Sequence, residues 1–200
     1  MISLLLSMIV LINPFALFVY LVPVIKDLPF GAFLKVLFKA SLISYVIYAV
    51  FSQFGEFIFN NILSIHFESF RIFGGLIIIA IALDFIIQGK KAFLTMKGSL
   101  QELASEIALP FMVGASSIAI SIIIGNKFAT LQALLIIALA LSINYGTIVL
   151  LVLLKNHLPS KKLKLAFDNF MGYFLRINGF LVGAIGIDMT SEGIKNMFLN

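Results

Sequence analysis

The sequence contains no cysteine and no tryptophan, and only 12% of its 200 residues are charged. The absence of cysteine excludes disulfides, thiolate metal sites and cysteine nucleophiles. Soluble domains carry about 25% charged residues, so this chain has about half the charge that a water-exposed surface requires. The scarcity of charge therefore excludes a soluble enzyme, a nucleic-acid-binding domain and a disordered tail.

Hydrophobic residues make up 62% of the sequence, and the 14 basic residues lie in short clusters between apolar runs. A helix needs about 20 mostly apolar residues to cross a bilayer. Six runs meet this requirement, at residues 2–25, 36–57, 70–88, 107–124, 130–154 and 169–189. They do not alternate between apolar and polar residues, as membrane β-strands do. The sequence predicts an all-α membrane protein with six transmembrane helices, surrounded by lipid.

The basic residues are distributed unevenly between the two sides of the predicted bundle. Ten of the 14 lie in or beside the first, third and fifth loops, at Lys26, Lys35, Lys39, Lys90, Lys91, Lys97, Lys155, Lys161, Lys162 and Lys164. Only Lys127 and Lys195 lie on the other side. Because cytoplasmic loops are rich in Lys and Arg, we expect these three loops inside the cell and both termini outside.

The two halves of the chain share short motifs at similar offsets. Residues 71–74 (RIFG) match residues 176–179 (RING) at an offset of 105, and Asp84 matches Asp188 at 104. Shorter matches link Pro14 to Pro110, at an offset of 96, and residues 43–45 to 143–145, at 100. Chance likeness between apolar segments is the alternative explanation, but offsets that change in loops and hold within helices are typical of a duplication.

Three spans in each half would give the two copies opposite orientations. The sequence therefore predicts a 3+3 inverted-topology repeat of residues 1–98 and 99–200, within one membrane domain. Such repeats are characteristic of secondary transporters, whose substrate site lies near the midplane between the repeats.

Several motifs resemble the MarC family: Asn13-Pro14 in the first span, residues 70–75 (FRIFGG) with 82–84 (ALD), and residues 109–114 (LPFMVG). The resemblance covers nearly the whole chain. It departs at Ala16 and at residues 114–116 (GAS), where the family usually has glycine and commonly GPG. The resemblance implies a six-span plasma-membrane protein with both termini outside. It also implies kinship to small-neutral-amino-acid transporters and to a wider superfamily of amino-acid exporters.

Two predicted spans contain helix-breaking residues at mid-depth. Pro14 removes a helical hydrogen bond next to the polar Asn13, and Pro110 precedes a small polar stretch that includes Gly114, Ser116 and Ser117. Freed backbone groups persist in a membrane only where protein or a watery cavity satisfies them. We predict that these six residues and Asn144, near the centre of span five, line a substrate site. The alternatives are structural kinks, close helix packing and, for Asn144, a bond to a neighbouring helix. Asn178 lies close to an end of its span and carries less weight.

Four charged residues lie within the predicted spans. If the halves are inverted, Arg71 and Asp188 lie at similar outer depth, and Arg176 and Asp84 at similar inner depth. We hypothesise that these are two cross-repeat charge pairs that latch gates, because charges in membranes seek partners. Separate snorkelling of each side chain to the headgroups is the alternative.

The pattern as a whole favours a secondary transporter or exporter of small neutral amino acids, or similar solutes, that works by alternating access. We do not expect an enzyme, because Asp84 and Asp188 should lie near opposite faces and no metalloprotease motif is present. We expect no cofactor and no metal, except a Na⁺ ion held by carbonyls near Asn13 and Gly114 if transport is coupled. An accessory membrane protein and a channel are the alternatives. Substrate, direction and oligomeric state are left open.

Overall fold

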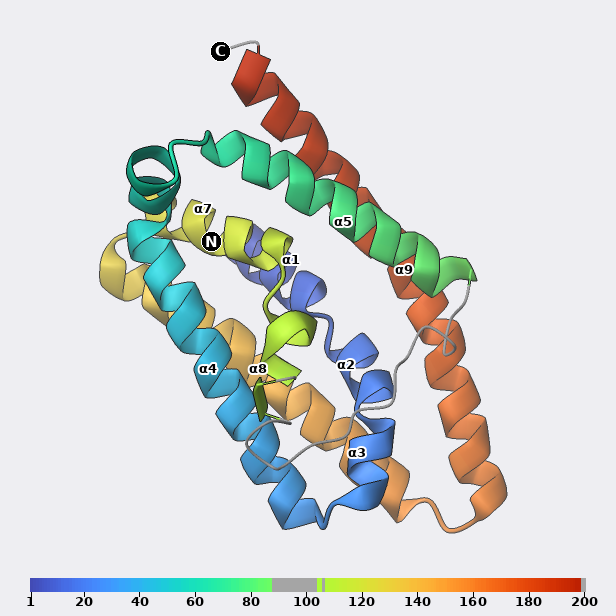
Figure 1. Cartoon of the computed structure of the whole chain (residues 1–200). Coiled ribbons are helices and arrows are strands. Elements are labelled where there is room, and N and C mark those ends of the chain that lie inside the picture. Colours follow the sequence, from blue (N-terminus) through green and yellow to red (C-terminus); the bar gives the residue numbers. More distant parts are fainter. Residues whose placement is uncertain (88–103, 106, 199–200) are drawn as a thin grey trace.

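The computed structural model describes residues 1–87, 104–105 and 107–198, with the side chains of residues 23, 26 and 109–111 left aside (Figure 1). Every regular element in these residues is helical. They are α1 (Ile2–Ile12), α2 (Pro14–Tyr20), α3 (Val22–Asp27), α4 (Phe30–Phe57), the π-helical turn η1 (Ile58–Ile62), α5 (Phe67–Ile87), the π-helical turn η3 (Ile107–Met112), α7 (Ala115–Lys127), α8 (Thr130–His157) and α9 (Lys161–Phe198). The predicted all-α membrane fold is confirmed.

Five stretches are long and apolar enough to cross a membrane: Ile2–Tyr20, Phe30–Ile62, Phe67–Ile87, Thr130–His157 and Lys161–Phe198. The sixth predicted span, residues 107–124, is built from η3 and the 13-residue helix α7. At 1.5 Å per residue α7 is about 20 Å long, which is short of the hydrocarbon thickness of about 30 Å. This span therefore depends on two helical pieces rather than on one continuous helix.

Several helices extend further than the apolar runs predicted. The second span begins at Phe30 instead of residue 36, and the last covers Lys161–Phe198 instead of 169–189. The reason is that a helix continues through charged residues outside the hydrocarbon layer, where hydropathy no longer marks it. The first span, predicted as residues 2–25, consists of α1, α2 and α3. The predicted boundary at residues 98 and 99, and Lys90, Lys91 and Lys97, lie outside the described residues.

Helices α4 and α8 are 28 residues each, and they bury equivalent positions. Each buried residue of α4 between Phe33 and Ser52 has a buried counterpart in α8 exactly one hundred positions later: 33/133, 36/136, 37/137, 40/140, 44/144, 48/148 and 52/152. This is the offset that relates residues 43–45 to 143–145 in the sequence. The two helices also run in roughly opposite directions (Figure 1). The inverted repeat itself stays a prediction.

Helices α5 and α9 pack side by side along much of their length (Figure 1). Glycines permit this close approach, since a Cβ on Gly75 would lie 2.7 Å from the carbonyl oxygen of Gly186 and one on Gly186 2.9 Å from that of Gly75. Gly179 and Gly183 likewise face Ala82 of α5. The small residues of α9 therefore serve helix packing.

The interrupted helices occupy the centre of the bundle. Helices α1 and α2 contact α8 and α9, while α7 contacts α4, α5 and α1. The two pairs of long helices thus enclose the two broken spans. The largest apolar cluster joins residues of α1, α2, α4, η3, α7 and α8. The fold therefore places both predicted helix breaks inside protein, where side chains can satisfy the freed backbone groups.

Candidate functional site

The first helix break lies at Asn13, between α1 and α2. Its backbone is left-handed, with φ 56° and ψ 78°, and Pro14 begins the next helix. Asn tolerates this conformation better than most residues, and Pro14 has no N–H to donate to the carbonyl of Val10. Asn13 Oδ1 accepts the backbone N–H of Ala16 at 3.1 Å and so caps α2. The predicted break is confirmed.

Asn13 is buried, with 4% of its surface exposed. Asn178 Nδ2 of α9 donates to Asn13 Oδ1 at 2.9 Å. Asn13 Nδ2 is also buried, and it has no hydrogen-bond acceptor among the described residues. An amide donor buried without a partner is costly, so this group is poised to bind a ligand oxygen or a water molecule.

A pocket of about 220 Å³ opens beside this break, and we name it the Asn13 pocket. It is lined by Leu11, Ile12, Asn13, Ala16, Tyr20, Ile78, Ile81, Phe85 and Val182, from α1, α2, α5 and α9. The volume is below the 300–1,000 Å³ typical of sites for drug-sized ligands. Among the predicted site residues, Asn13 is one that lines a cavity.

The second helix break lies at Val113 and Gly114, between η3 and α7. Gly114 is extended, with φ −116° and ψ 169°, and its N–H donates to Ser117 Oγ at 2.9 Å. The Met112 carbonyl accepts the hydroxyl of Tyr48, from α4, at 2.6 Å. The small polar stretch that the sequence singled out therefore closes the end of one helix and begins the next.

Ser116 connects this second break to α5. Its hydroxyl is buried and donates to the carbonyl of Gly74 at 2.8 Å. A Cβ on Gly74 would lie 3.1 Å from the backbone nitrogen of Ser116, so glycine permits the approach of the two helices. Ser116 and Ser117 thus satisfy backbone groups, which is the structural alternative that the sequence left open.

The two breaks are tied to opposite halves of the chain in a matching way. Asn13 of the first half bonds to Asn178 of α9, and Ser116 of the second half bonds to Gly74 of α5. Gly74 and Gly179, which directly follows Asn178, are equivalent in the 71–74 and 176–179 motifs. The two breaks share no hydrogen bond with each other within the described residues.

Asn144 is fully buried in α8, at the position equivalent to Ser44 of α4. Its Nδ2 donates to the Ala140 carbonyl at 3.0 Å, and Ser44 Oγ donates in the same way to Ala40. Asn144 Oδ1 is buried and accepts no hydrogen bond from the described residues. Asn144 therefore bonds its own helix rather than a neighbouring one. The side chain of Pro110, which belongs to η3, lies outside the described residues.

Arg71 is the most buried charged residue of the candidate site, with 9% of its surface exposed. It forms an ion pair with Glu192 of α9 at 2.5 Å and a second one with Glu68 of α5 at 3.6 Å. The hypothesis paired Arg71 with Asp188, which lies one helical turn before Glu192. The structure links Arg71 to α9, but through Glu192 instead of Asp188.

The second hypothesised pair, Arg176 and Asp84, consists of two exposed residues. In the described part of the chain they form no ion pair with each other, and the Asp84 carboxylate interacts electrostatically with Tyr20 instead. The structure does not bring Arg176 and Asp84 together as a latch. Snorkelling is the arrangement that their exposure favours.

A larger pocket, of about 430 Å³, surrounds Arg71, and we name it the Arg71 pocket. Its lining comes from the beginnings of α1 and α5 and the ends of α7 and α9: Ser3, Leu4, Ser7, Arg71, Ile120, Ile123, Lys127, Ala184, Ile185, Asp188, Met189 and Glu192. Arg71 lies 14 residues before Phe85 of the Asn13 pocket on the same helix, which corresponds to about 21 Å. The two pockets therefore lie toward opposite ends of the bundle.

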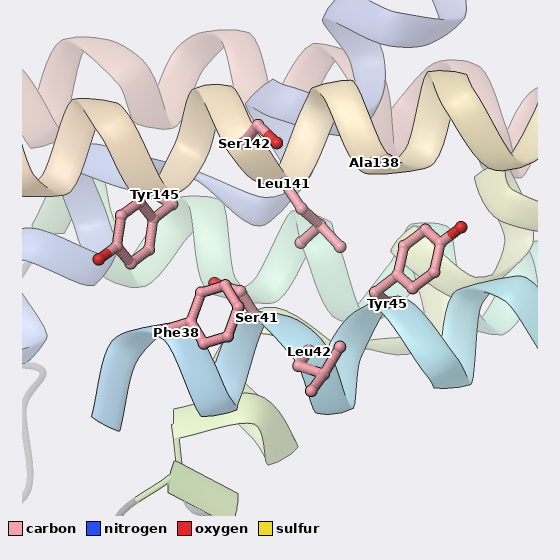
Figure 2. Close-up of a pocket in the computed structure, with 8 residues that line it drawn as sticks. All are labelled: Phe38, Ser41, Leu42, Tyr45, Ala138, Leu141, Ser142 and Tyr145. Atoms are coloured by element: carbon pink, nitrogen blue, oxygen red, sulfur yellow. The ribbon is translucent and has the colours of Figure 1, made fainter. Parts of the chain in front are cut away.

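A groove of about 310 Å³ lies between α4 and α8 (Figure 2). Its lining residues are equivalent pairs at the offset of 100: Phe38/Ala138, Ser41/Leu141, Leu42/Ser142 and Tyr45/Tyr145. The rings of Phe38 and Tyr145 are in edge contact at 6.4 Å, whereas Tyr45 faces the small Ala138 across the groove (Figure 2). Position 138 is alanine where the equivalent residue of α4 is Phe38, and the smaller side chain leaves part of the groove open.

The carbonyls at the two breaks, which the sequence nominated as Na⁺ ligands, already accept hydrogen bonds. The Asn13 carbonyl accepts from Leu17 N–H at 3.0 Å, and the Gly114 carbonyl from Ile118 N–H at 3.0 Å. No group of three or more His, Asp or Glu residues that could hold a metal ion exists in the described parts of the chain. A Na⁺ site at the breaks stays a prediction.

Two residues of the site were missed from the sequence. Asn178 was placed near the end of its span, but α9 begins at Lys161, so Asn178 lies near the middle of that helix. Glu192 lies beyond the predicted span and was not considered as a partner of Arg71. Only one signal for Glu192 was present in the sequence: an acidic residue at helical spacing from Asp188.

Comparison with known proteins identifies the family of this chain. The profile of the MarC family integral membrane proteins matches residues 1–198. The chain belongs to the MarC family. A curated relative of this MarC protein, a UPF0056 membrane protein from Pyrococcus horikoshii, is 21% identical over 167 residues, which cover 83% of this chain and 79% of the relative. No solved structure matches the chain.

The motif at residues 70–75, which carried the resemblance to the MarC family, has a physical role in this MarC protein. Arg71 pairs with Glu192 of α9, Gly74 admits the first turn of α7, and Gly75 admits α9. Consecutive glycines lie about 100° apart around a helix, so each opens the surface of α5 to a different neighbour. The motif therefore joins three helices around the candidate site.

Proposed function

We propose that this MarC protein is a secondary transporter of small neutral amino acids, or similar small solutes, in the plasma membrane. The observation that carries the proposal is the left-handed break at Asn13 inside a membrane-crossing stretch. Unwound backbone within a membrane is characteristic of transporter substrate sites. Here the break carries a buried amide donor without an acceptor, beside a cavity of about 220 Å³.

The positions of the two pockets support alternating access. The Arg71 pocket contains Ile185 and Met189, and the Asn13 pocket contains Ile81 and Phe85, which are their equivalents at the offset of 104. Each half thus contributes matching positions to a cavity near one end of the bundle. Two related cavities of this kind are what a rocking motion of inverted repeats requires.

An apolar cluster borders the Arg71 pocket and reaches one residue of the Asn13 pocket. Leu11 lines the Asn13 pocket, Ile123 and Ile185 line the Arg71 pocket, and all three pack against the same cluster of buried residues. That cluster comprises Phe59, Phe67, Ala119, Ile122 and Met189. In this proposal, small shifts of α5 and α9 against the broken helices open one pocket at a time.

We base the proposed orientation on the distribution of lysines, which supports both termini and the Arg71 pocket lying outside the cell. The Asn13 pocket then opens toward the cytoplasm. In this arrangement Asn13 Nδ2 donates to a carboxylate oxygen of the substrate, and the small volume of the pocket favours short side chains. The family assignment alone gives an integral membrane protein, and the proposal adds a transport function and a class of substrate.

The proposal is tested by measuring uptake of labelled glycine, alanine, serine and leucine into proteoliposomes, with and without Na⁺ and pH gradients. Saturable uptake that favours the smaller amino acids is expected. Saturable uptake should fall at least tenfold in Asn13→Gly and persist in Gly146→Ala, whose Cβ meets nothing within 4 Å. Absence of flux from correctly folded protein would support an accessory role, and conductance that does not saturate would support a channel.

A further inference from the structure

The Arg71 pocket contains two residues of each charge, an unusual composition for a cavity in a membrane protein. Arg71 and Lys127 carry positive charge, and Asp188 and Glu192 carry negative charge. Glu68 also pairs with Arg71 without lining the pocket, so Arg71 is shared between two carboxylates.

The four charges are not equally available. Arg71 and Glu192 are bound to each other. Lys127 and Asp188 line the same pocket, yet neither forms an ion pair in the described part of the chain. One positive and one negative group therefore line a shared cavity without an ion-pair partner among the residues that the structure describes.

A second observation concerns the buried guanidinium. The side chain of Arg71 is only 11% exposed, and its Nε–H is buried with no acceptor among the described residues. A guanidinium presents five donors in a fixed fork. Two ion pairs leave this donor unused, in the wall of the cavity that Lys127 and Asp188 share.

We infer that the Arg71 pocket is a recognition site for a zwitterion, an α-amino acid with a free carboxylate and a free ammonium group. Lys127, with Arg71 behind it, binds the carboxylate, and Asp188 binds the ammonium. The inference rests on the proposed function for its biological role, as the outer capture site that precedes passage to the Asn13 pocket. It adds the charges by which the substrate is selected and the residues that select it.

The remaining lining accounts for the side chain of the ligand. Leu4, Ile120, Ile123 and Ile185 form an apolar wall from α1, α7 and α9. Ser3 and Ser7 lie four residues apart on α1, so they share one face of that helix and give it a polar edge. An apolar or small side chain fits against the isoleucines, whereas a charged side chain would be desolvated against this apolar wall.

The test is equilibrium binding of labelled L-alanine to purified protein in detergent, so that it does not depend on flux. Lys127→Gln and Asp188→Asn should each weaken binding at least tenfold. Lys127→Arg and Asp188→Glu, which keep the charges, should retain most of it. Lys195→Gln is the matched control, because Lys195 is an exposed charge at the same end of α9 outside the pocket lining.

Ligand analogues examine the two charges separately. Alaninamide lacks the carboxylate and propionate lacks the ammonium, so both should compete at least tenfold more weakly than alanine. Equal competition by either analogue, or full binding in both neutral variants, would overturn the site. A phosphatidylethanolamine headgroup carries the same two charges, and displacement of alanine is expected only at high lipid concentration. Saturable binding of a short-chain phosphatidylethanolamine without binding of alanine would assign the pocket to lipid and also overturn the inference.

This design separates the inference from the proposed function. Binding that depends on Lys127 and Asp188, in a protein that shows no flux, would support the recognition site and contradict transport. Flux that is unaffected in Lys127→Gln and Asp188→Asn would support transport and contradict the recognition site.

Discussion

Asn178 of α9 donates a hydrogen bond of 2.9 Å to Asn13, the residue at which the first membrane-crossing stretch is unwound. The two residues are separated by 165 positions, and both are buried. The bond fixes the break against the longest helix of the opposite half. It also occupies Asn13 Oδ1, so that Nδ2 is the group of this amide left without a partner among the described residues.

Substitution of Asn13 separates its structural role from its chemical role. Asn13→Ala should destabilise the protein by about 2–4 kcal/mol, because alanine loses the cap of α2, tolerates positive φ poorly and leaves Asn178 Nδ2 without its acceptor. Asn13→Gly should cost about 1–3 kcal/mol, because glycine accepts this conformation but also leaves the buried Asn178 amide without its acceptor. Both variants should lose saturable uptake in proteoliposomes. If Asn13→Gly folds and transports normally, the amide has no role in substrate binding.

The break itself was predictable from the sequence, because proline within an apolar run identifies it directly. The partner of Asn13 was not, since hydropathy placed the start of the last span at residue 169 while α9 begins at Lys161. Helices extend past the hydrocarbon layer without any hydropathy signal. An eight-residue error at that end moved Asn178 from the middle of the helix to its margin.

Glycines of α5 and α8 should respond to alanine in opposite directions. Gly75→Ala places a Cβ against the Gly186 carbonyl and the Thr190 hydroxyl, so we expect a loss of about 1–3 kcal/mol from overpacking. Gly146→Ala meets nothing within 4 Å and should gain about 0.5–1 kcal/mol of helix stability. Unfolding of each variant by denaturant in detergent measures both effects. Equal responses would mean that α5 and α9 are not in close contact.

The hydroxyl of Tyr48 should stabilise the second helix break. Tyr48→Phe removes the 2.6 Å bond to the Met112 carbonyl in a fully buried position and should cost about 1–1.5 kcal/mol. Tyr45→Phe, on the same helix at the α4–α8 groove, is the control and should change the free energy of unfolding by less than about 0.5 kcal/mol. The Ser117 hydroxyl also donates to this carbonyl at 3.4 Å, so a neutral Tyr48→Phe would show that Ser117 alone satisfies it.

Arg71 and Arg176 are equivalent in the sequence but should behave differently. Arg71→Gln leaves the buried end of α5 without its charge and Glu192 without its partner, so a loss of about 1–3 kcal/mol is expected. Arg176 is exposed and forms no ion pair in the described part of the chain, so Arg176→Gln should be close to neutral. Denaturation curves of the two variants provide the comparison. Similar losses would point to a shared structural role that the contacts do not explain.

Membrane depth predicted from the sequence was not enough to identify the ion-pair partner of Arg71. Two acidic residues on one face of α9, at positions 188 and 192, lie one turn apart, or about 6 Å. Depth alone does not choose between them, since the choice depends on the reach and rotamer of Arg71. The helical membrane fold, in contrast, followed from composition and from the lengths of the apolar runs.

Alternating access is tested most directly by thiol labelling, for which the chain is suited because it contains no cysteine. Ile81→Cys and Ile185→Cys place one thiol in each pocket at equivalent positions, and Leu150→Cys, on an exposed apolar position of α8, is the control. With a membrane-impermeant reagent, saturating L-alanine should change the labelling rates at positions 81 and 185 in opposite directions and leave position 150 unlabelled. Rates that change together, or not at all, in protein that binds alanine would contradict the account.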